Sequence, residues 1–355
     1  MNNTMNKWLT GLVILAVVIG GYFVLNAKKT VSVNAQAIKI GVMTDLTGPA
    51  AGYWGEPTRA GAQLAAQELN SKGYNVQLFF EDYQLDASKA PGALQKLINI
   101  DKVDALYVEF NPGAIVAAST LKSEPIPMIY DAAITSPLKE SEYFFKTYLD
   151  YQAGCRALAQ KFKDEGMQKI GMLKINLEAG ELCLQGIKEV FGTNVVIEGY
   201  NLGNTDLRTQ LLKIKSSGVS AVINVGFEGD TYNTLKVIHD LGYNLKFGTV
   251  DDTITEKITS AYGEELKGAW TFGFRDVDSA FKSKIDASAG RSFGTYYGAA
   301  IAYTHVTQLA QALVACDKDT KCVADKIADS PANTTIGFRG FQDRIADLDM
   351  LTKQY

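Results

Sequence analysis

Two stretches of the sequence place residues suited to holding a small solute directly after predicted strands. In the first, Tyr53 and Trp54 lie in a loop of small residues between an apolar run at 38–42 and a helix that begins near Pro57. In an open α/β sheet, ligands collect at the carboxyl ends of strands, beside helix N-termini. Trp54 would then form one wall of a cleft, although the same spacing also fits an ordinary connection from a strand to a helix.

The second stretch follows a predicted buried strand and opens a helix. Asn111 suits an N-cap and Pro112 the first helical position, which would leave the N–H groups of Gly113 and Ala114 without partners. Such N–H groups lie at the positive end of the helix dipole and favour a carboxylate. A plain helix cap explains the same residues.

Catalytic, metal and nucleic-acid functions find little support in the sequence. The only histidines, His239 and His305, lie far apart in predicted helices without ligand spacing, and no phosphate-binding or dinucleotide-binding glycine pattern follows a strand. The net charge is -4, and beyond residue 37 the chain carries 32 basic against 39 acidic residues. This balance gives no electrostatic footprint for nucleic acid. We expect a protein that is not an enzyme and needs no cofactor or metal.

The N-terminal residues 1–37 contain an apolar, uncharged run at 8–25. The run is longer than the apolar core of most signal peptides and close to the roughly 20 residues that cross a bilayer. Ala35-Gln36-Ala37 offers a cleavage site, but it lies far beyond the run. We expect one apolar helix that is retained as a membrane anchor and followed by a linker, with cleavage as a signal peptide as the alternative.

The four cysteines are expected to pair, because an exported chain folds in an oxidising compartment. Cys316 and Cys322 flank a short polar segment and predict one disulfide. Cys155 and Cys183 lie near the starts of two predicted neighbouring helices, and they predict a second if their Cα atoms lie about 6 Å apart.

Strand and helix patterns alternate from residue 38 to about 150 and again from 151 to about 250. Such alternation predicts an α/β protein whose parallel sheets are covered by helices on both faces. Beyond residue 273 the pattern changes to a long helix at 296–315, a short helix at 322–328 and two extended runs within 335–355.

A family resemblance begins with Thr47-Gly48-Pro49, continues with Tyr53-Trp54-Gly55-Glu56 and the helix at 61–70, and runs in order from about residue 38 to about residue 340. The chain resembles the type I periplasmic solute-binding proteins of ABC importers, nearest the branched-chain amino acid (leucine/isoleucine/valine) binding proteins. The resemblance implies two doubly wound parallel-sheet lobes joined by a three-strand hinge. Lobe one would comprise residues 38–149 and 274–334, and lobe two residues 150–273 and 335–355.

In lobe one, the resemblance places three residues at the ligand. Asn111 stands where the family has a serine that binds the ligand carboxylate. Ala133 and Thr135 lie in a loop similar to an Ala-Ala-Thr run of the family, with the hydroxyl one residue further along.

In lobe two, Ala179 and Phe227 each replace a tyrosine that contacts ligand in the family, which implies a larger and more apolar pocket. Asp251 falls in register with the acid that binds the ligand ammonium. An acid at a strand end is also a common solvated turn residue.

The resemblance implies an extracytoplasmic substrate-binding protein, periplasmic or anchored to the cell membrane, that captures an amino acid or amide-like solute by hinge closure and delivers it to ABC permease subunits. Tyr53 and Trp54 would cover the ligand, the helix start at Asn111 and Thr135 would take its anionic end, and Asp251 its cationic end. The alternative is a membrane-anchored sensor domain of the same fold that signals to a membrane partner.

Overall fold

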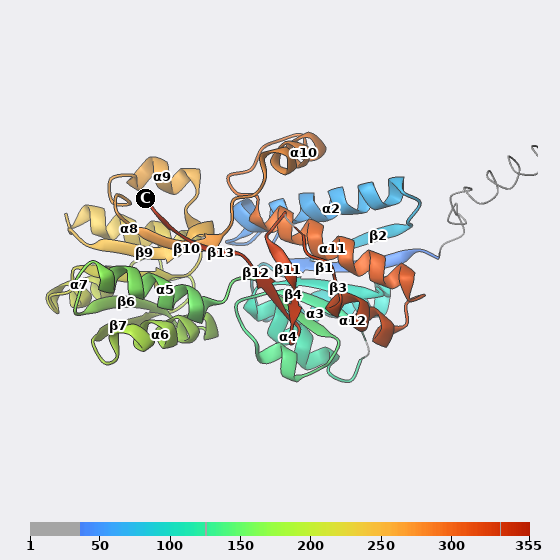
Figure 1. The fold of residues 1–355 in the computed structure, drawn as a ribbon, viewed down its shortest axis with the longest axis horizontal. Coiled ribbons are helices and arrows are strands. Elements are labelled where there is room, and N and C mark those ends of the chain that lie inside the picture. The colour runs from blue at the N-terminus through green and yellow to red at the C-terminus, as the bar shows by residue number, and fades with distance from the viewer. Residues whose placement is uncertain (1–35, 125, 334) are drawn as a thin grey trace, which may run out of the picture. The chain divides into compact units, whose positions relative to one another are not determined.

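Residues 37–355 fold into two largely parallel β-sheets, each covered by helices (Figure 1). The computed structural model describes residues 36–124, 126–333 and 335–355. The predicted anchor or signal run therefore lies outside the described residues. Within the described ranges, no helix is both long enough and apolar enough to cross a membrane.

The sheet of lobe one has seven strands in the order β11-β12-β5-β4-β3-β1-β2. Its central strands read as short apolar runs because helices cover both faces. All neighbours are parallel except the hairpin of β11 with β12. The strands are β1 (Ile38–Thr44), β2 (Val76–Asp82), β3 (Ala105–Glu109), β4 (Met128–Asp131), β5 (Phe144–Thr147), β11 (Phe338–Gln342) and β12 (Ile345–Leu348).

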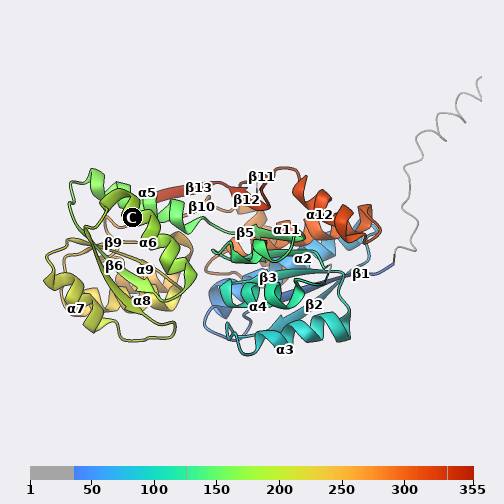
Figure 2. The same ribbon diagram turned by 90° about the horizontal axis from the view of Figure 1, so that it is seen from below.

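Helices α2 and α11 pack against each other on one face of this sheet, while α3 and α4 lie on the other face (Figure 2). A π-helical turn, Ala51–Gly55, leads into α2, and a second, Lys96–Asp101, extends α3. A 3-10 turn, Ser136–Lys139, precedes β5. The helices are α2 (Glu56–Ser71), α3 (Ala90–Gln95), α4 (Asn111–Leu121), α10 (Ser279–Ala289), α11 (Tyr297–Ala315) and α12 (Thr320–Ala328).

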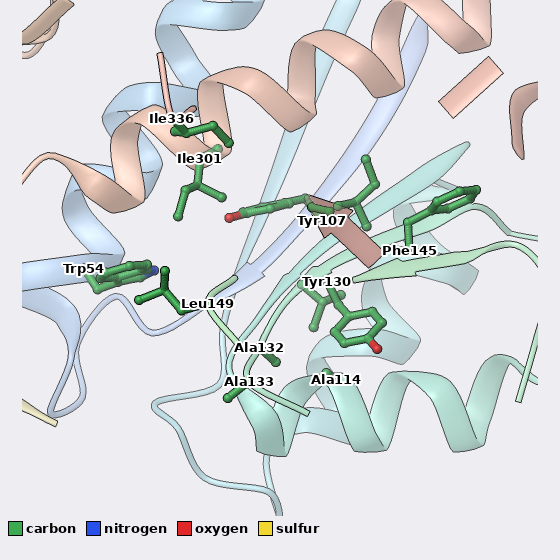
Figure 3. Packing of buried hydrophobic residues seen from close by; sticks show 14 of the residues in the cluster. Trp54, Tyr107, Ala114, Tyr130, Ala132, Ala133, Phe145, Leu149, Ile301 and Ile336 are labelled. Atoms are coloured by element: carbon green, nitrogen blue, oxygen red, sulfur yellow. The ribbon is translucent and has the colours of Figure 1, made fainter. Parts of the chain in front are cut away.

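The core of lobe one lies between these layers (Figure 3). Tyr107 and Tyr130 project from the central strands, Ile301 comes from α11 and Ala114 from α4, and all four side chains are fully buried. Trp54 lies at the end of this core that faces lobe two.

Lobe two repeats the same strand order, β13-β10-β9-β8-β6-β7, with only the edge strand β13 antiparallel. Its strands are β6 (Ile170–Ile175), β7 (Val195–Tyr200), β8 (Ala221–Val225), β9 (Lys246–Val250), β10 (Trp270–Phe274) and β13 (Met350–Gln354). Its helices are α5 (Tyr151–Asp164), α6 (Glu178–Phe191), α7 (Arg208–Ser216), α8 (Glu228–Asp240) and α9 (Glu256–Tyr262), and a 3-10 turn, Asp251–Thr253, follows β9.

The chain passes between the lobes after β5, after β10 and between β12 and β13 (Figures 1 and 2). The segment 335–355, assigned whole to lobe two from the sequence, is divided by the last passage. Asp343 and Arg344 both adopt positive φ, 49° and 65°, and close the β11–β12 hairpin onto lobe one. Ile345 then pairs with Lys146 of β5, so only β13 belongs to lobe two.

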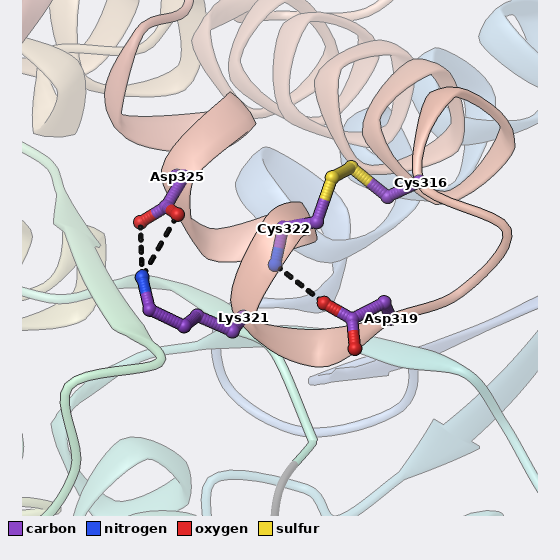
Figure 4. The surroundings of a disulfide bond; sticks show 5 residues. All are labelled: Cys316, Asp319, Lys321, Cys322 and Asp325. Carbon is purple, nitrogen blue, oxygen red and sulfur yellow. Dashed lines mark hydrogen bonds and ion pairs between the residues drawn. A yellow bond between two sulfur atoms is a disulfide. The ribbon is translucent and has the colours of Figure 1, made fainter.

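Both cysteine pairs are bonded in the structure. Cys155 of α5 and Cys183 of α6 lie 5.1 Å apart at their Cα atoms, and Cys316 and Cys322 lie 5.6 Å apart. Asp319 caps the start of α12 by accepting from the backbone N–H of Cys322 at 2.9 Å, beside the second disulfide (Figure 4). The first pair joins two packed helices of lobe two, and the second joins the end of α11 to the start of α12.

Candidate ligand-binding site

The carboxyl ends of the two sheets face each other, and a pocket lies between them. It contains about 570 Å³ of non-atom space, part of it open to solvent. Both lobes have the strand order in which the switch point lies beside the first strand, where ligands of open α/β sheets collect. The pocket is lined by Tyr53, Trp54, Phe110, Asn111, Asp131, Ala132, Ala133, Tyr148, Tyr151, Ile175, Leu177, Ala179, Val225, Gly226, Phe227, Asp252 and Thr253.

Tyr53 and Trp54 reach this pocket from the π-helical turn before α2. The turn lies so close to the end of β1 that only glycine fits at position 55. A Cβ on Gly55 would lie 1.6 Å from the carbonyl oxygen of Asp45. The Asp45 carboxylate also accepts from the backbone N–H of Ala50 at 2.7 Å. Tyr53 is buried and faces residues of lobe two across the pocket.

The indole of Trp54 is held in place by the buried carboxyl group of Glu109. The indole N–H donates to Glu109 Oε1 at 3.1 Å, and Thr44 and Thr58 donate their hydroxyls to the same carboxyl group. Burial, with repulsion from Asp131 second, raises the pKa of Glu109 well above its ordinary value. Glu109 is fully buried and does not line the pocket, so its role is to position Trp54.

Phe110 holds an unusual backbone conformation at the end of β3. Its φ of 64° and ψ of 157° lie in a region that is essentially restricted to glycine. The conformation directs the ring into the pocket, where it meets Phe227 of lobe two edge to face with 5.9 Å between ring centroids. Backbone strain of this kind gathers at functional sites.

The start of α4 differs from the predicted carboxylate seat. The helix begins at Asn111, and Phe110 occupies the N-cap position. Asn111 lines the pocket, but its Oδ1 accepts from the backbone N–H of Ala133 at 3.1 Å. The Ala114 N–H donates to the Phe110 carbonyl at 3.0 Å, and Gly113 packs against Tyr83, whose hydroxyl would lie 3.0 Å from an added Cβ. Of the two N–H groups that the sequence left without partners, that of Ala114 is therefore used inside lobe one, and neither residue lines the pocket.

The acid of lobe two that lines the pocket is Asp252, whereas the sequence pointed to Asp251. The 3-10 turn after β9 sends these neighbouring side chains in different directions. Asp251 accepts from Thr271 at 2.9 Å, Lys353 at 2.9 Å and Tyr355 at 2.9 Å, outside the pocket.

Asp252 lies against the hinge. Its Oδ2 accepts from the hydroxyl of Tyr148, which follows β5 with a φ of 96° and forms part of the first passage between the lobes. Burial raises the pKa of Asp252 to about 7. Tyr151, at the start of α5, packs edge to face on Tyr148 with 5.8 Å between the centroids.

Asp131 is the matching acid of lobe one, at the end of β4. Its Oδ2 accepts from the Tyr107 hydroxyl at 3.2 Å. Burial raises the pKa of Asp131 to about 7, while the charge of buried Lys146 opposes the shift. Sequence reasoning missed Asp131, although an acid directly after an apolar strand was the signal that could have found it.

Of the other residues predicted to bind ligand, most line the pocket and one does not. Ala133, Ala179 and Phe227 line the pocket with Tyr53 and Trp54. Thr135 is exposed and borders a different hollow, so the structure does not bring its hydroxyl to the pocket. Within the described part of the chain, no group of three or more His, Cys, Asp or Glu residues could hold a metal ion.

Comparison with known proteins identifies the family. Residues 37–348 match the family described as periplasmic binding protein. The chain belongs to the periplasmic binding protein family. A curated member, the leucine-, isoleucine-, valine-, threonine- and alanine-binding protein of Pseudomonas aeruginosa, is 26% identical over 339 residues, covering 88% of each chain. The relatives of this periplasmic binding protein are solute-binding proteins, and it is likewise no enzyme.

Solved structures agree on the fold. A solute-binding protein of an ABC transporter from R. palustris, in complex with 4-hydroxybenzoate, superposes with a TM-score of 0.81 at 19% identity, covering 90% of this chain and 93% of the other. The branched-chain amino acid transporter substrate-binding protein of Streptococcus pneumoniae, in complex with isoleucine, gives 0.79 at 18% identity, covering 90% and 96%. Both confirm the two-lobed type I fold that the sequence predicted.

Proposed function

We propose that this protein is the extracytoplasmic substrate-binding component of an ABC importer, which captures a small polar solute between its lobes and delivers it to permease subunits. The observation that carries the proposal is the pocket itself, because the carboxyl ends of both sheets contribute to its walls. A ligand contacted by both lobes stabilises the closed arrangement by the difference in its affinity for the closed and open states. Relatives named for amino acids or solved with an aromatic acid support a solute of amino acid size.

Intrinsic fluorescence of the full chain tests this proposal. Trp54 lines the pocket, whereas Trp270 lies on lobe two with its indole bonded to Glu165. In titrations with amino acids, primary amines, amides and benzoates, one class should change the emission with a one-to-one stoichiometry. Trp54→Phe should abolish that change and Trp270→Phe should retain it. Absence of binding by all four classes would contradict the proposal.

We also propose that the apolar run at 8–25 holds the protein at the outer surface of the cell membrane. A linker of about a dozen residues would then allow the lobes to lie within some tens of ångströms of the bilayer. Mass spectrometry of the exported protein should find this run still attached. A mature chain that starts at Ile38 would show that the run is a cleaved signal peptide.

A further inference from the structure

The ionisable side chains of the pocket wall include two aspartates, one from each lobe. Asp131 of lobe one and Asp252 of lobe two both line it, with 2% and 4% of their surfaces exposed. Among the described residues that line the pocket, none is Lys, Arg or His. Buried charges of this kind need an opposite charge or hydrogen-bond donors.

In each of these acids one carboxyl oxygen makes no hydrogen bond within the described residues. Oδ1 of Asp131 and Oδ1 of Asp252 are buried without a hydrogen-bond partner among the described residues. Their Oδ2 atoms are bonded to the hydroxyls of Tyr107 and Tyr148. A buried acceptor left unpaired costs about 1–3 kcal/mol, and more when it is charged, so a ligand that brings N–H donors gains from pairing both.

The aromatic walls of the pocket suit a ligand that carries an ammonium group on an apolar body. Trp54 meets Tyr148 edge to face with 5.6 Å between centroids, and Phe110 meets Phe227 at 5.9 Å. All four rings line the pocket, and the faces of such rings attract ammonium groups.

No cationic side chain of the described lining is available for a ligand carboxylate. At the start of α4 the Ala114 N–H donates to the carbonyl of Phe110, and Gly113 does not line the pocket. Lys146 attracts Asp131 but borders another hollow, where its Nζ donates to the carbonyl of Tyr148 at 3.2 Å. A carboxylate in the pocket would therefore face two acids without a cationic partner.

We propose that the pocket takes a protonated primary amine with a small apolar body and no carboxylate, held between Asp131 of lobe one and Asp252 of lobe two. The assignment rests on the proposed function and narrows its solute class. Closure brings the second acid to the ammonium, so charge pairing and lobe closure occur together.

Calorimetry on the full chain with a matched set of probes tests the assignment. Benzylamine should bind at least about 100-fold more tightly than benzyl alcohol, which has the same ring without the charge, and than benzoate, which reverses it. N,N,N-Trimethylbenzylammonium keeps the charge but has no N–H, and should bind at least about 10-fold more weakly than benzylamine. Leucine and phenylalanine should also bind more weakly.

Variants locate the binding groups. Asp131→Asn and Asp252→Asn should each weaken benzylamine binding by at least about 30-fold. Glu264→Gln is the charge-matched control, because Glu264 is exposed and pairs with Lys267 three residues away, outside the pocket, and it should leave binding unchanged. The probe series on the unaltered protein needs no variant to fold, so it decides the question if either aspartate variant is unstable.

Tighter binding of leucine, phenylalanine or benzoate than of benzylamine would overturn the amine assignment and leave the proposed function standing. Equal binding of the trimethylated probe would overturn the requirement for N–H donors. A chain that binds none of these probes, nor any amino acid or amide, would contradict both the assignment and the proposed function.

Discussion

Asp251 and Asp252 are adjacent in the chain yet serve different parts of the molecule. The first is bonded to Thr271, Lys353 and Tyr355 between strands of lobe two, and the second faces the pocket. Substitution of Asp251 should therefore affect mainly the stability of the fold, and substitution of Asp252 mainly ligand binding.

We expect Asp251→Asn to lower the free energy of unfolding by about 2 kcal/mol, because it leaves the donors of Lys353 and Tyr355 poorly paired. Ligand affinity should change less than about 3-fold, since this side chain lies outside the pocket. Urea unfolding and calorimetry measure the two effects. Asp276→Asn is the control: its side chain also contacts Lys353 but is 76% exposed, and it should cost less than about 0.5 kcal/mol. An equal loss of unfolding free energy in Asp251→Asn and Asp276→Asn would show that the buried contacts of Asp251 do not stabilise the fold.

The protonation of the two pocket acids is set by their surroundings. Asp252 is faced by the hydroxyls of Tyr53, Tyr148 and Tyr151 and by the carboxylate of Asp251. None of these groups carries a positive charge. Burial therefore dominates and raises the pKa of Asp252 to about 7.

Asp131 is faced by Tyr107, by Glu109 across the strand pair, by Asp252 across the pocket and by the cation of Lys146. Burial lowers the pKa of Lys146 to about 8, so the lysine offsets only part of the shift. The unliganded fold thus favours the protonated forms of both pocket acids, and their contribution to stability falls as the pH rises from about 4 through about 7.

Binding of benzylamine should depend on pH in the opposite sense. The ammonium pairs with ionised carboxylates, so protons compete with it below pH 7. Between pH 5.5 and pH 8 the affinity should rise about 30-fold for each carboxyl group that must lose a proton. Calorimetry across this range measures the profile, and Asp252→Asn should remove the part of the rise that comes from Asp252. A flat profile in the unaltered protein would mean that neither acid changes its protonation on binding.

At the scale of the elements, the repeating strand and helix pattern was predictable because β-branched runs and helical spacing are local signals. The direction of a side chain at the end of a strand was not. A 3-10 turn at 251–253 decides between Asp251 and Asp252, and the positive φ of Phe110 shifts the start of α4. The division of residues 335–355 was also hidden, because pairing of β12 with β5 joins residues about 200 apart in the chain.

The contact between α2 and α11 depends on Gly61. A Cβ at this position would lie 2.0 Å from the carbonyl oxygen of Ala299, a backbone atom that cannot move aside without shifting α11. Gly61→Ala should therefore lower the free energy of unfolding by about 3 kcal/mol or more.

Gly92→Ala provides the matched control within α3, where an added Cβ meets nothing within 4 Å. There the change should raise the free energy of unfolding by about 0.5–1 kcal/mol, because alanine loses less backbone entropy. Urea unfolding of both variants measures the contrast. Similar changes in unfolding free energy for Gly61→Ala and Gly92→Ala would show that α2 and α11 can move apart without a loss of stability.

At the scale of the whole ligand-binding unit, contacts between the lobes should govern ligand release. Phe227→Ala removes the ring that meets Phe110 across the pocket, and it should weaken binding about 10-fold, mainly through faster dissociation. Ser136→Ala removes a 3.0 Å hydrogen bond to Glu178 at the edge of the same interface, and should change the rate less than about 3-fold. Stopped-flow fluorescence measures both rates. An unchanged dissociation rate in Phe227→Ala would show that this contact does not limit opening.

The three passages between the lobes also set an order for folding during synthesis. Lobe two receives β6 to β10 and its five helices from one continuous segment, and only the edge strand β13 comes later. Lobe one begins earlier, but its sheet lacks α11 on one face until residue 315 has been made, and β11 and β12 follow. Because a sheet with an uncovered apolar face is poorly stable, the lobe that starts second should be the first to become resistant to protease on a growing chain.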